Sequence, residues 1–325
     1  MNRDDTLAFW IAAPGRGELR REKLPARRDQ EASVRTLYSG VSRGTEALVF
    51  AGRVPVGEYA RMRAPFQAGE FPGPVKYGYV SVGEVTAGPR AVVGRTVFCL
   101  HPHQQHYVVP CDALYVLPEQ VPAARAVLAA NLETALNGLW DSLAGPGDRI
   151  AVIGGGSVGC LLAWLAARMP GCTVELIDVN PHRAAIAQAL GVGFALPEAA
   201  TPEADVVLHA SGSAEGLQLA MRLAGFEATV LELSWYGDRT ISLPLGEAFH
   251  ARRLTLKSSQ VGAIGHARRA RWSLRRRMEL ALSLLADPAL EVLINSDGRF
   301  EDLPQTLERL SRTPGDVIMH RVHYT

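Results

Sequence analysis

Residues 149–178 read RIAVIGGGSVGCLLAWLAARMPGCTVELID and decide the fold of this chain. The apolar run at 149–153 stops in glycine, and residues 160–169 then carry apolar side chains at helical spacing. A second apolar run follows at 173–177. This order predicts a strand, a tight turn, a helix and a second strand, which is the usual beginning of a parallel sheet covered by helices.

The turn contains a dinucleotide-binding motif. Gly154, Gly156 and Gly159 have the spacing G-x-G-x-x-G, which allows a tight bend, close approach of a pyrophosphate and close packing of helix on strand. The N–H groups and the dipole at the helix start favour phosphate. The alternative is a glycine turn in an ordinary α/β unit. We expect cofactor contacts from the whole turn: Gly154, Gly155, Gly156, Ser157, Val158 and Gly159.

An acidic residue ends the second predicted strand. Asp178 lies 19 residues after Gly159. A carboxylate at this place accepts hydrogen bonds from both hydroxyls of an adenosine ribose and repels a 2′-phosphate. The sequence therefore predicts NAD as the cofactor, in preference to NADP.

The composition is that of an ordinary globular protein. A chain of 325 residues with 47% hydrophobic content can bury a large core and is long enough for about two domains. Its net charge of +1 gives no general attraction to nucleic acid or to an anionic membrane, and no apolar run is long enough to span a bilayer. The four cysteines form no C-x-x-C pair and have no regular spacing, so neither a disulfide framework nor a cysteine-rich zinc lobe is indicated, and a reducing cytoplasm fits: Cys99, Cys111, Cys160 and Cys172.

The remaining patterns divide the chain into a β-rich and an α/β part. Short β-type runs with frequent Gly and Pro extend to about residue 118, and helical spacing follows at 123–143. Strands and helices then alternate, which predicts a doubly wound parallel sheet that binds ligands at the carboxyl ends of its strands. They are expected at 181–190 (helix), 205–210 (strand), 214–224 (helix), 228–233 (strand) and 254–258 (strand).

Two segments near the C-terminus remain. Residues 267–286 predict a strongly basic helix with six arginines. A solvated face with arginine stems on apolar neighbours is the favoured interpretation, and an anionic partner or a nucleic acid are the alternatives. A helix at 303–310 and a strand at 317–322 end the chain and could pair back with the N-terminal β region.

Three landmarks resemble a known family. SGVSRGTE at 39–46 is similar to the segment S-G-I-C-R-S-D with one residue inserted, GYVSVGEV at 78–85 to G-H-E-x-x-G-x-V, and DVN at 178–180 to the D-x-N of NAD-using members. Together with the order of the regions, they resemble the medium-chain dehydrogenase/reductase superfamily, which includes zinc alcohol dehydrogenases and zinc-free quinone reductases.

The resemblance implies a doubly wound Rossmann sheet and a β-rich GroES-like catalytic domain. The Rossmann domain would comprise residues 122–263. The catalytic domain would combine residues 1–121 with 264–325. The family also implies a cleft between the two domains and a homodimer formed through the nucleotide-domain sheet.

The zinc ligands of the family are replaced in this chain. The cysteine position of the first landmark is Ser42, the histidine position of the second is Tyr79, and the third ligand position aligns near Asn131. A hydroxyl, a phenol and an amide make a poor zinc site, because zinc prefers thiolate, imidazole and carboxylate. The four-cysteine structural lobe is missing too. We therefore expect no bound metal.

A side chain must then polarise the substrate oxygen or move its proton. His101 is the first candidate, because by alignment it ends a strand that lines the substrate cleft and because imidazole titrates near neutral pH. Tyr79 replaces a lost ligand, and Thr45 matches the family's proton-relaying hydroxyl. Each could instead be structural. A loop could also gather His101, His103 and His106 into a new metal site, although their spacing does not fit one face of a strand.

Further cofactor contacts follow from alignment with the family. Arg43 matches an arginine that reaches the pyrophosphate, and Asn180 belongs to the D-x-N landmark. Ser211 and Gly212 end a strand that borders a ribose of the cofactor. Residues that end later strands would face the nicotinamide, namely Ser234, Ser259 and Gln260.

The sequence thus predicts a zinc-independent, NAD(P)(H)-dependent oxidoreductase of the alcohol dehydrogenase-like type. It would transfer hydride to or from a small alcohol or carbonyl substrate, and it would act without nucleic-acid or membrane partners. The alternative is an NAD-binding protein that has lost catalysis. Substrate-dependent oxidation or reduction of the cofactor discriminates between the two.

Overall fold

The computed structural model describes residues 5–313 and 315–324. The chain forms two compact units, and the second comprises residues 131–281 and 289–293. The first comprises the remainder, from both ends of the chain. These boundaries differ from the expected division at 122 and 263, because the arginine-rich segment belongs to the second unit. Within the described ranges, no helix is long and apolar enough to cross a membrane.

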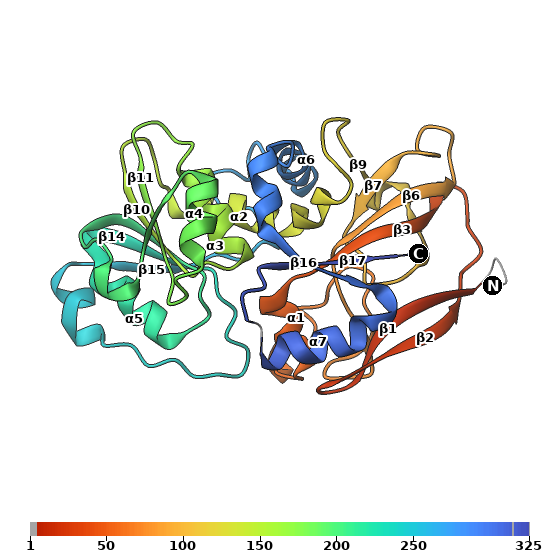
Figure 1. Ribbon diagram of the computed structural model, residues 1–325, viewed down its shortest axis with the longest axis horizontal. Helices are drawn as coiled ribbons and strands as arrows, with labels where there is room; N and C mark the ends of the chain where they lie inside the picture. The colour runs from red at the N-terminus through yellow and green to blue at the C-terminus, as the bar shows by residue number, and fades with distance from the viewer. Residues whose placement is uncertain (1–4, 314, 325) are drawn as a thin grey trace. The chain divides into compact units, whose positions relative to one another are not determined.

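The second unit contains a six-stranded parallel sheet with the order β12-β11-β10-β13-β14-β15 (Figure 1). The strand order reverses beside the first strand, β10, and ligands of doubly wound sheets bind at such a point. The predicted parallel sheet is thus confirmed. Its strands are β10 Arg149–Ile153, β11 Thr173–Ile177, β12 Gly193–Ala195, β13 Ala204–His209, β14 Ala224–Glu232 and β15 Thr255–Ser258.

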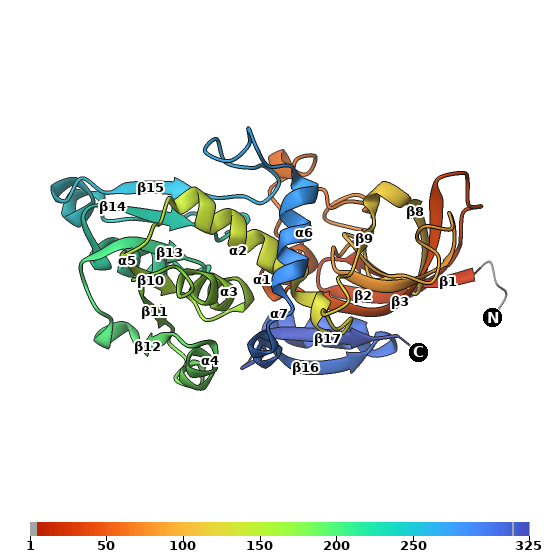
Figure 2. The ribbon, with the colours of Figure 1, turned by 90° about the horizontal axis from the view of Figure 1, so that it is seen from above.

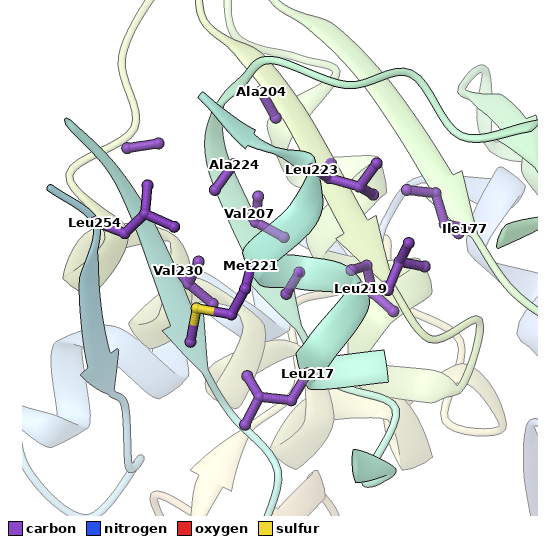
Figure 3. Packing of buried hydrophobic residues seen from close by; sticks show 14 of the residues in the cluster. Ile177, Ala204, Val207, Leu217, Leu219, Met221, Leu223, Ala224, Val230 and Leu254 are labelled. Carbon is purple, nitrogen blue, oxygen red and sulfur yellow. The ribbon is translucent and has the colours of Figure 1, made fainter. Parts of the chain in front are cut away.

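Helices pack on this sheet through their apolar faces. Leu217 and Met221 of α5 lie against Val207 and Val230 of the strands below, and all four side chains are buried (Figure 3). A further helix, α2, runs beside β15 (Figure 2), where the ammonium of Lys257 donates to a carbonyl oxygen near the end of that helix. The helices of this unit are α3 Ser157–Ala166, α4 Arg183–Leu190 and α5 Ala214–Leu223, together with most of α2 Ala129–Ser142 and most of α6 Leu274–Leu284.

The first unit is built on two β-sheets. The larger has the order β16-β17-β3-β6-β7-β9, with β8 also paired to β3, and the smaller has the order β2-β1-β5-β4. The strands are β1 Asp5–Ala13, β2 Arg16–Lys23, β3 Glu31–Val41, β4 Ala68–Gly69, β5 Val75–Lys76, β6 Ser81–Ala87, β7 Thr96–Cys99, β8 His106–Pro110, β9 Tyr115–Val116, β16 Ile294–Arg299 and β17 Met319–His323. The helices are α1 Arg43–Phe50 and α7 Leu303–Arg312.

The C-terminal strand pairs with the N-terminal region, as the sequence suggested. β17 lies antiparallel to β3 and pairs His320 with Val41 and His323 with Tyr38. Residues from opposite ends of the chain therefore share one sheet.

The basic helix begins later than expected. The prediction of a helix from 267 was wrong, because α6 starts at Leu274 and the hydroxyl of Ser273 accepts the N–H of Arg276 at 3.1 Å. A serine in this position is a typical helix cap. The arginine stems do lie on apolar neighbours: the guanidinium of Arg276 stacks over Trp272.

One arginine of α6 is buried. Arg277 is 1% exposed, and its guanidinium donates to the Glu133 carboxylate and the Asn137 amide oxygen on α2, and to the carbonyl of Val261. Burial raises the pKa of Glu133, against the lowering effect of Arg277. This contact fixes α6, and the loop before it, on α2.

Replacing Arg277 by Met should strongly destabilise the second unit, because it leaves Glu133 buried without its cation. We expect the free energy of unfolding to fall by roughly 3–5 kcal/mol, measured by urea denaturation followed by circular dichroism. The control is Arg275→Met. This arginine is exposed and pairs with Glu279 at 3.4 Å, so its loss should cost less than about 1 kcal/mol. Equal effects of the two substitutions would contradict this account.

Candidate active site

The glycine turn of the second unit connects β10 to α3 and leaves open space on one side. Gly154 has a φ of +107°, which side-chain-bearing residues rarely adopt. A Cβ on Gly159 would lie 1.8 Å from the Gly154 carbonyl oxygen, so only glycine allows this approach of helix and turn. A Cβ on Gly156 would meet no atom within 4 Å. Packing therefore explains two of the glycines, and the open space at Gly156 fits the approach of a ligand.

Asp178 closes the same turn from the neighbouring strand. Its carboxylate follows β11 and accepts the Gly155 N–H at 2.5 Å and the Asn180 N–H at 2.8 Å. The predicted acid and the glycine motif are therefore adjacent. Ser157 and Val158 form the first turn of α3.

The residues predicted at later strand ends have different surroundings. The Ser211 backbone adjoins the glycine turn, since a Cβ on Gly154 would lie 2.7 Å from its Cα. Next to it, the Gly212 N–H donates to the Ser234 hydroxyl at 3.0 Å. The Ser259 hydroxyl instead donates to Asp141 on α2 at 2.7 Å, and the Gln260 side chain accepts the Gly262 N–H at 2.7 Å.

Two residues that the sequence analysis did not single out join this edge of the sheet. His209 and Glu232 are the last residues of β13 and β14 and lie opposite each other in register. Their side chains are 2.8 Å apart, from imidazole Nδ1 to carboxylate Oε2. Imidazole Nε2 lies 2.6 Å from the hydroxyl of Ser211. A histidine and a glutamate ending adjacent strands were the signal that could have revealed the pair.

In the first unit, Tyr79 lies beside two hydroxyls. Ser42 and Thr45 lie close enough to its phenol to lower its pKa, so the structure brings together two catalytic candidates, Tyr79 and Thr45, and two lost ligand positions, Tyr79 and Ser42. Burial, with the charge of Glu46, raises the pKa of Tyr79 well above its ordinary value, although the two hydroxyls lower it. The phenol is therefore neutral near pH 7 and able to donate a hydrogen bond.

A buried chain of polar side chains extends from this cluster. The Glu46 carboxylate accepts the Ser42 N–H at 2.8 Å and contacts Nε2 of His103 at 2.8 Å. Nδ1 of His103 lies 2.7 Å from the Ser39 hydroxyl, which lies 3.0 Å from the phenol oxygen of Tyr324. The sequence analysis considered His103 only as a metal ligand and missed this chain, because its members come from distant segments.

Glycine at position 78 makes room for His103. A Cβ on Gly78 would lie 2.8 Å from Cδ2 of His103, and its φ of +133° also favours glycine. The imidazole therefore packs directly on the backbone that precedes Tyr79. Position 78 therefore requires glycine for two reasons, the close packing of His103 and the positive φ of the backbone.

His101 lies in an apolar stack. Its ring is parallel to that of Tyr107, with centroids 3.8 Å apart, and Phe66 stacks on it at 5.5 Å. Burial lowers the pKa of His101 to about 3, against the opposing effect of the Pro102 carbonyl at 2.9 Å from Nδ1. The imidazole is therefore neutral near pH 7 and can accept a hydrogen bond but cannot act as an acid.

The remaining predictions concern Arg43 and metal binding. The guanidinium of Arg43 donates to the Val317 carbonyl at 2.9 Å. Among residues 5–313 and 315–324, no three His, Cys, Asp or Glu side chains are grouped to hold a metal ion, so His101, His103 and His106 are not gathered into one site. The side chains at the lost ligand positions, Ser42, Tyr79 and Asn131, do not fit zinc.

Comparisons with known proteins agree with this architecture. No family model matches the chain. A curated relative, the D-guloside 3-dehydrogenase of Escherichia coli K12, is 24% identical over 320 residues and 89% of each chain. A Sinorhizobium meliloti protein described as a zinc-binding dehydrogenase, solved with NADP, superposes with a TM-score of 0.79 at 18% identity over 99% of this chain and 100% of its own. An E. coli alcohol dehydrogenase solved with NADH superposes with a TM-score of 0.74 at 14% identity, over 98% of this chain and 99% of its own.

These likenesses confirm the resemblance stated from the sequence. The chain resembles the medium-chain dehydrogenase/reductase superfamily and has the fold of its members, with a Rossmann unit and a β-rich unit, and the named relatives are dehydrogenases. The two cofactor-bound neighbours carry different nicotinamide cofactors, so they leave the choice between NAD and NADP open.

The two glycines of the turn should respond differently to alanine. In Gly159→Ala the new Cβ meets a backbone carbonyl, so we expect the melting temperature to fall by several degrees. In Gly156→Ala the Cβ meets no protein atom, so stability should be nearly unchanged. Its NADH affinity should still fall by roughly tenfold or more, because the Cβ occupies the side that a pyrophosphate approaches. Thermal melts and NADH titrations test both. Unchanged NADH binding by Gly156→Ala would contradict this placement of the phosphates.

Proposed function

We propose that this protein is a zinc-independent oxidoreductase that moves a hydride between NAD(H) and a small alcohol or carbonyl substrate. One observation carries the zinc independence: Ser42, Tyr79 and Asn131 stand at the three ligand positions. None of them offers the thiolate, imidazole or carboxylate that zinc prefers. Polarising the substrate oxygen then requires a side chain.

Tyr79 is our candidate for this role. Its phenol is kept protonated by burial and by the charge of Glu46, which raise its pKa. A neutral phenol can donate a hydrogen bond to a carbonyl oxygen on which negative charge develops. The hydroxyls of Ser42 and Thr45 contact the phenol, and we assign to Thr45 the passage of the proton between substrate and solvent.

His101 has a different role in this proposal. Its low pKa excludes the imidazolium near pH 7. With its Nδ1 proton directed at the Pro102 carbonyl, Nε2 is left as a hydrogen-bond acceptor. We therefore propose that it accepts a hydrogen bond from a substrate hydroxyl and does not deliver a proton.

A nicotinamide cofactor supplies or accepts the hydride, and the second unit has the residues to bind it. The glycine turn and the start of α3 fit a pyrophosphate, and Asp178 fits the two hydroxyls of an adenosine ribose. The fixed carboxylate supports our proposal that NAD is preferred to NADP. The same proposal assigns cofactor contacts to Arg43, Asn180, Ser211, Gly212, Ser234, Ser259 and Gln260.

We further propose a cytoplasmic homodimer. The described structure has β15 as an edge strand of the parallel sheet, with Leu256 38% exposed, and an exposed edge can pair with a second copy. Sedimentation velocity would reveal a dimer. All four cysteines are free thiols, which fits a reducing compartment.

The competing proposal is an NAD-binding protein without catalysis. It rests on the replacement of all three ligand positions. Both proposals require NADH binding, but only the enzyme requires cofactor turnover that depends on an added alcohol or carbonyl compound.

Tyr79→Phe should reduce kcat/KM by about 10²- to 10³-fold, because it removes one hydrogen-bond donor to the developing oxyanion. NADH affinity should not change. The matched control is Tyr77→Phe, a buried phenol two residues away, which should retain most of the activity. Steady-state kinetics and NADH titrations make the comparison. Equal activity of Tyr79→Phe and the unaltered enzyme would contradict the assigned role, and tightly bound stoichiometric zinc would overturn zinc independence.

Asp178→Asn should narrow the preference for NADH over NADPH. The substitution removes a charged acceptor for the ribose hydroxyls and the repulsion of a 2′-phosphate. We expect the ratio of the two dissociation constants to change by roughly tenfold or more. Asp205→Asn is the control, since this acid is the second residue of β13 and pairs with Arg149. An unchanged ratio in Asp178→Asn would show that Asp178 does not select the cofactor.

A further inference from the structure

His209 and Glu232, at the ends of two neighbouring strands, belong to a network of side-chain hydrogen bonds. The Glu232 carboxylate receives three donors: Nδ1 of His209 at 2.8 Å, the Ser234 N–H at 2.6 Å and the Tyr236 phenol at 2.8 Å. Burial acts to raise the pKa of Glu232, but the hydrogen bonds, above all from His209, outweigh it and lower that pKa. The group is therefore a carboxylate.

A carboxylate at this distance fixes the tautomer of a neutral imidazole. The ring proton of His209 must lie on Nδ1, because only a donor can face the carboxylate. Nε2 is then an acceptor, and the hydroxyl at 2.6 Å from it, that of Ser211, donates its proton to the ring. Ser211 consequently presents only lone pairs outward, and one of them meets the Ser213 N–H at 3.2 Å.

The chain preserves space for this arrangement. A Cβ on Gly216, in the first turn of α5, would lie 2.3 Å from the Ser211 hydroxyl oxygen and 2.8 Å from Nε2 of His209. His209 is fully buried, whereas Ser211 is exposed. A buried carboxylate, acting through a buried imidazole, thus orients one hydroxyl at the protein surface.

The position of the Ser211 hydroxyl indicates which part of a bound dinucleotide it can contact. Asp178 follows β11 and Ser211 follows β13, so the two acceptors flank the β10 glycine turn on opposite sides. A dinucleotide with its pyrophosphate at that turn and its adenosine ribose at Asp178 extends its other half over β13. That half carries a second ribose, and a hydroxyl of this ribose can donate to the second lone pair of Ser211, beside the Ser213 hydroxyl at 3.2 Å.

We propose that His209 and Glu232 are positioning residues that hold the Ser211 hydroxyl as a hydrogen-bond acceptor for the nicotinamide-bearing ribose. The proposal rests on the proposed dinucleotide function. It adds a relay, from carboxylate through imidazole to hydroxyl, that determines which groups Ser211 can bind. A phosphate, which has no proton to donate, gains nothing from such an acceptor.

Three ligands that differ by one group each test the proposal by titration: ADP, ADP-ribose and NADH. Ser211→Ala should raise the dissociation constants of ADP-ribose and NADH by about three- to tenfold, as expected for one neutral hydrogen bond. The dissociation constant of ADP, which lacks the second ribose, should not change. Ser211→Thr keeps the hydroxyl and should retain most of the affinity. An equal loss for ADP, or no loss for ADP-ribose, would overturn the proposal.

The relay itself requires a double-mutant cycle. Glu232→Gln keeps the shape of the side chain but removes the charge that fixes the tautomer. Like Ser211→Ala, it should therefore raise the dissociation constants of ADP-ribose and NADH. In a Ser211→Ala background it should add little, because its effect acts through Ser211. Additive losses would show a general structural effect and overturn the positioning role. Glu227→Gln is the control, an acid of the same strand paired with Arg253 at 2.8 Å.

The outcomes separate this inference from the proposed function. If the unaltered protein binds neither NADH nor ADP-ribose, the dinucleotide function is wrong and the inference falls with it. If the unaltered protein binds both and Ser211→Ala binds them equally well, only the inference is wrong.

Discussion

The nucleotide-binding unit depends on one backbone contact, the approach of α3 to the glycine turn. Gly159 lies so close to the Gly154 carbonyl that a single added carbon would collide with it. This contact sets where the helix begins, and the helix start sets where unpaired N–H groups can meet a phosphate. Asp178 and Ser211 can both contact the proposed cofactor only because both adjoin the same turn. The fixed backbone geometry of the turn thus determines where the side chains of this site are placed.

In the first unit, polar side chains stand at two positions that align with zinc ligands of the family, Ser42 and Tyr79. Tyr79, Ser42 and Thr45 form one hydroxyl cluster, and Glu46 and His103 lie behind it with almost no exposure. Buried ionisable groups are costly unless they are paired. The hydrogen bonds of Glu46 and His103 to each other, to Ser39 and to the backbone meet this requirement. The hydrogen bonds among these side chains consequently give the cluster a defined arrangement.

Much of the fold could be predicted from local sequence patterns. Contacts between residues that are far apart in the sequence could not. The glycine motif, Asp178 and the alternating elements lie within short windows, so spacing alone revealed them. Glu46 and His103 are 57 residues apart, and His209 and Glu232 are 23 apart, and no spacing rule connects such pairs. The start of α6 was mispredicted because the arginine pattern continues upstream of Ser273, the residue that caps the helix. The surroundings of His101 depend on Phe66 and Tyr107, which only the tertiary structure brings to it.

The pairing of β17 with β3 has a consequence for biosynthesis. Strand β17 lies between β16 and β3 in the larger sheet, and residues 131–281 form their own unit in between along the chain. A ribosome therefore releases the nucleotide-binding segment while the N-terminal β region still lacks two of its strands. Until β17 emerges, the β3 edge that it covers stays unpaired and open to other chains. β17 is thus synthesised after both of the strands that it joins, β3 and β16.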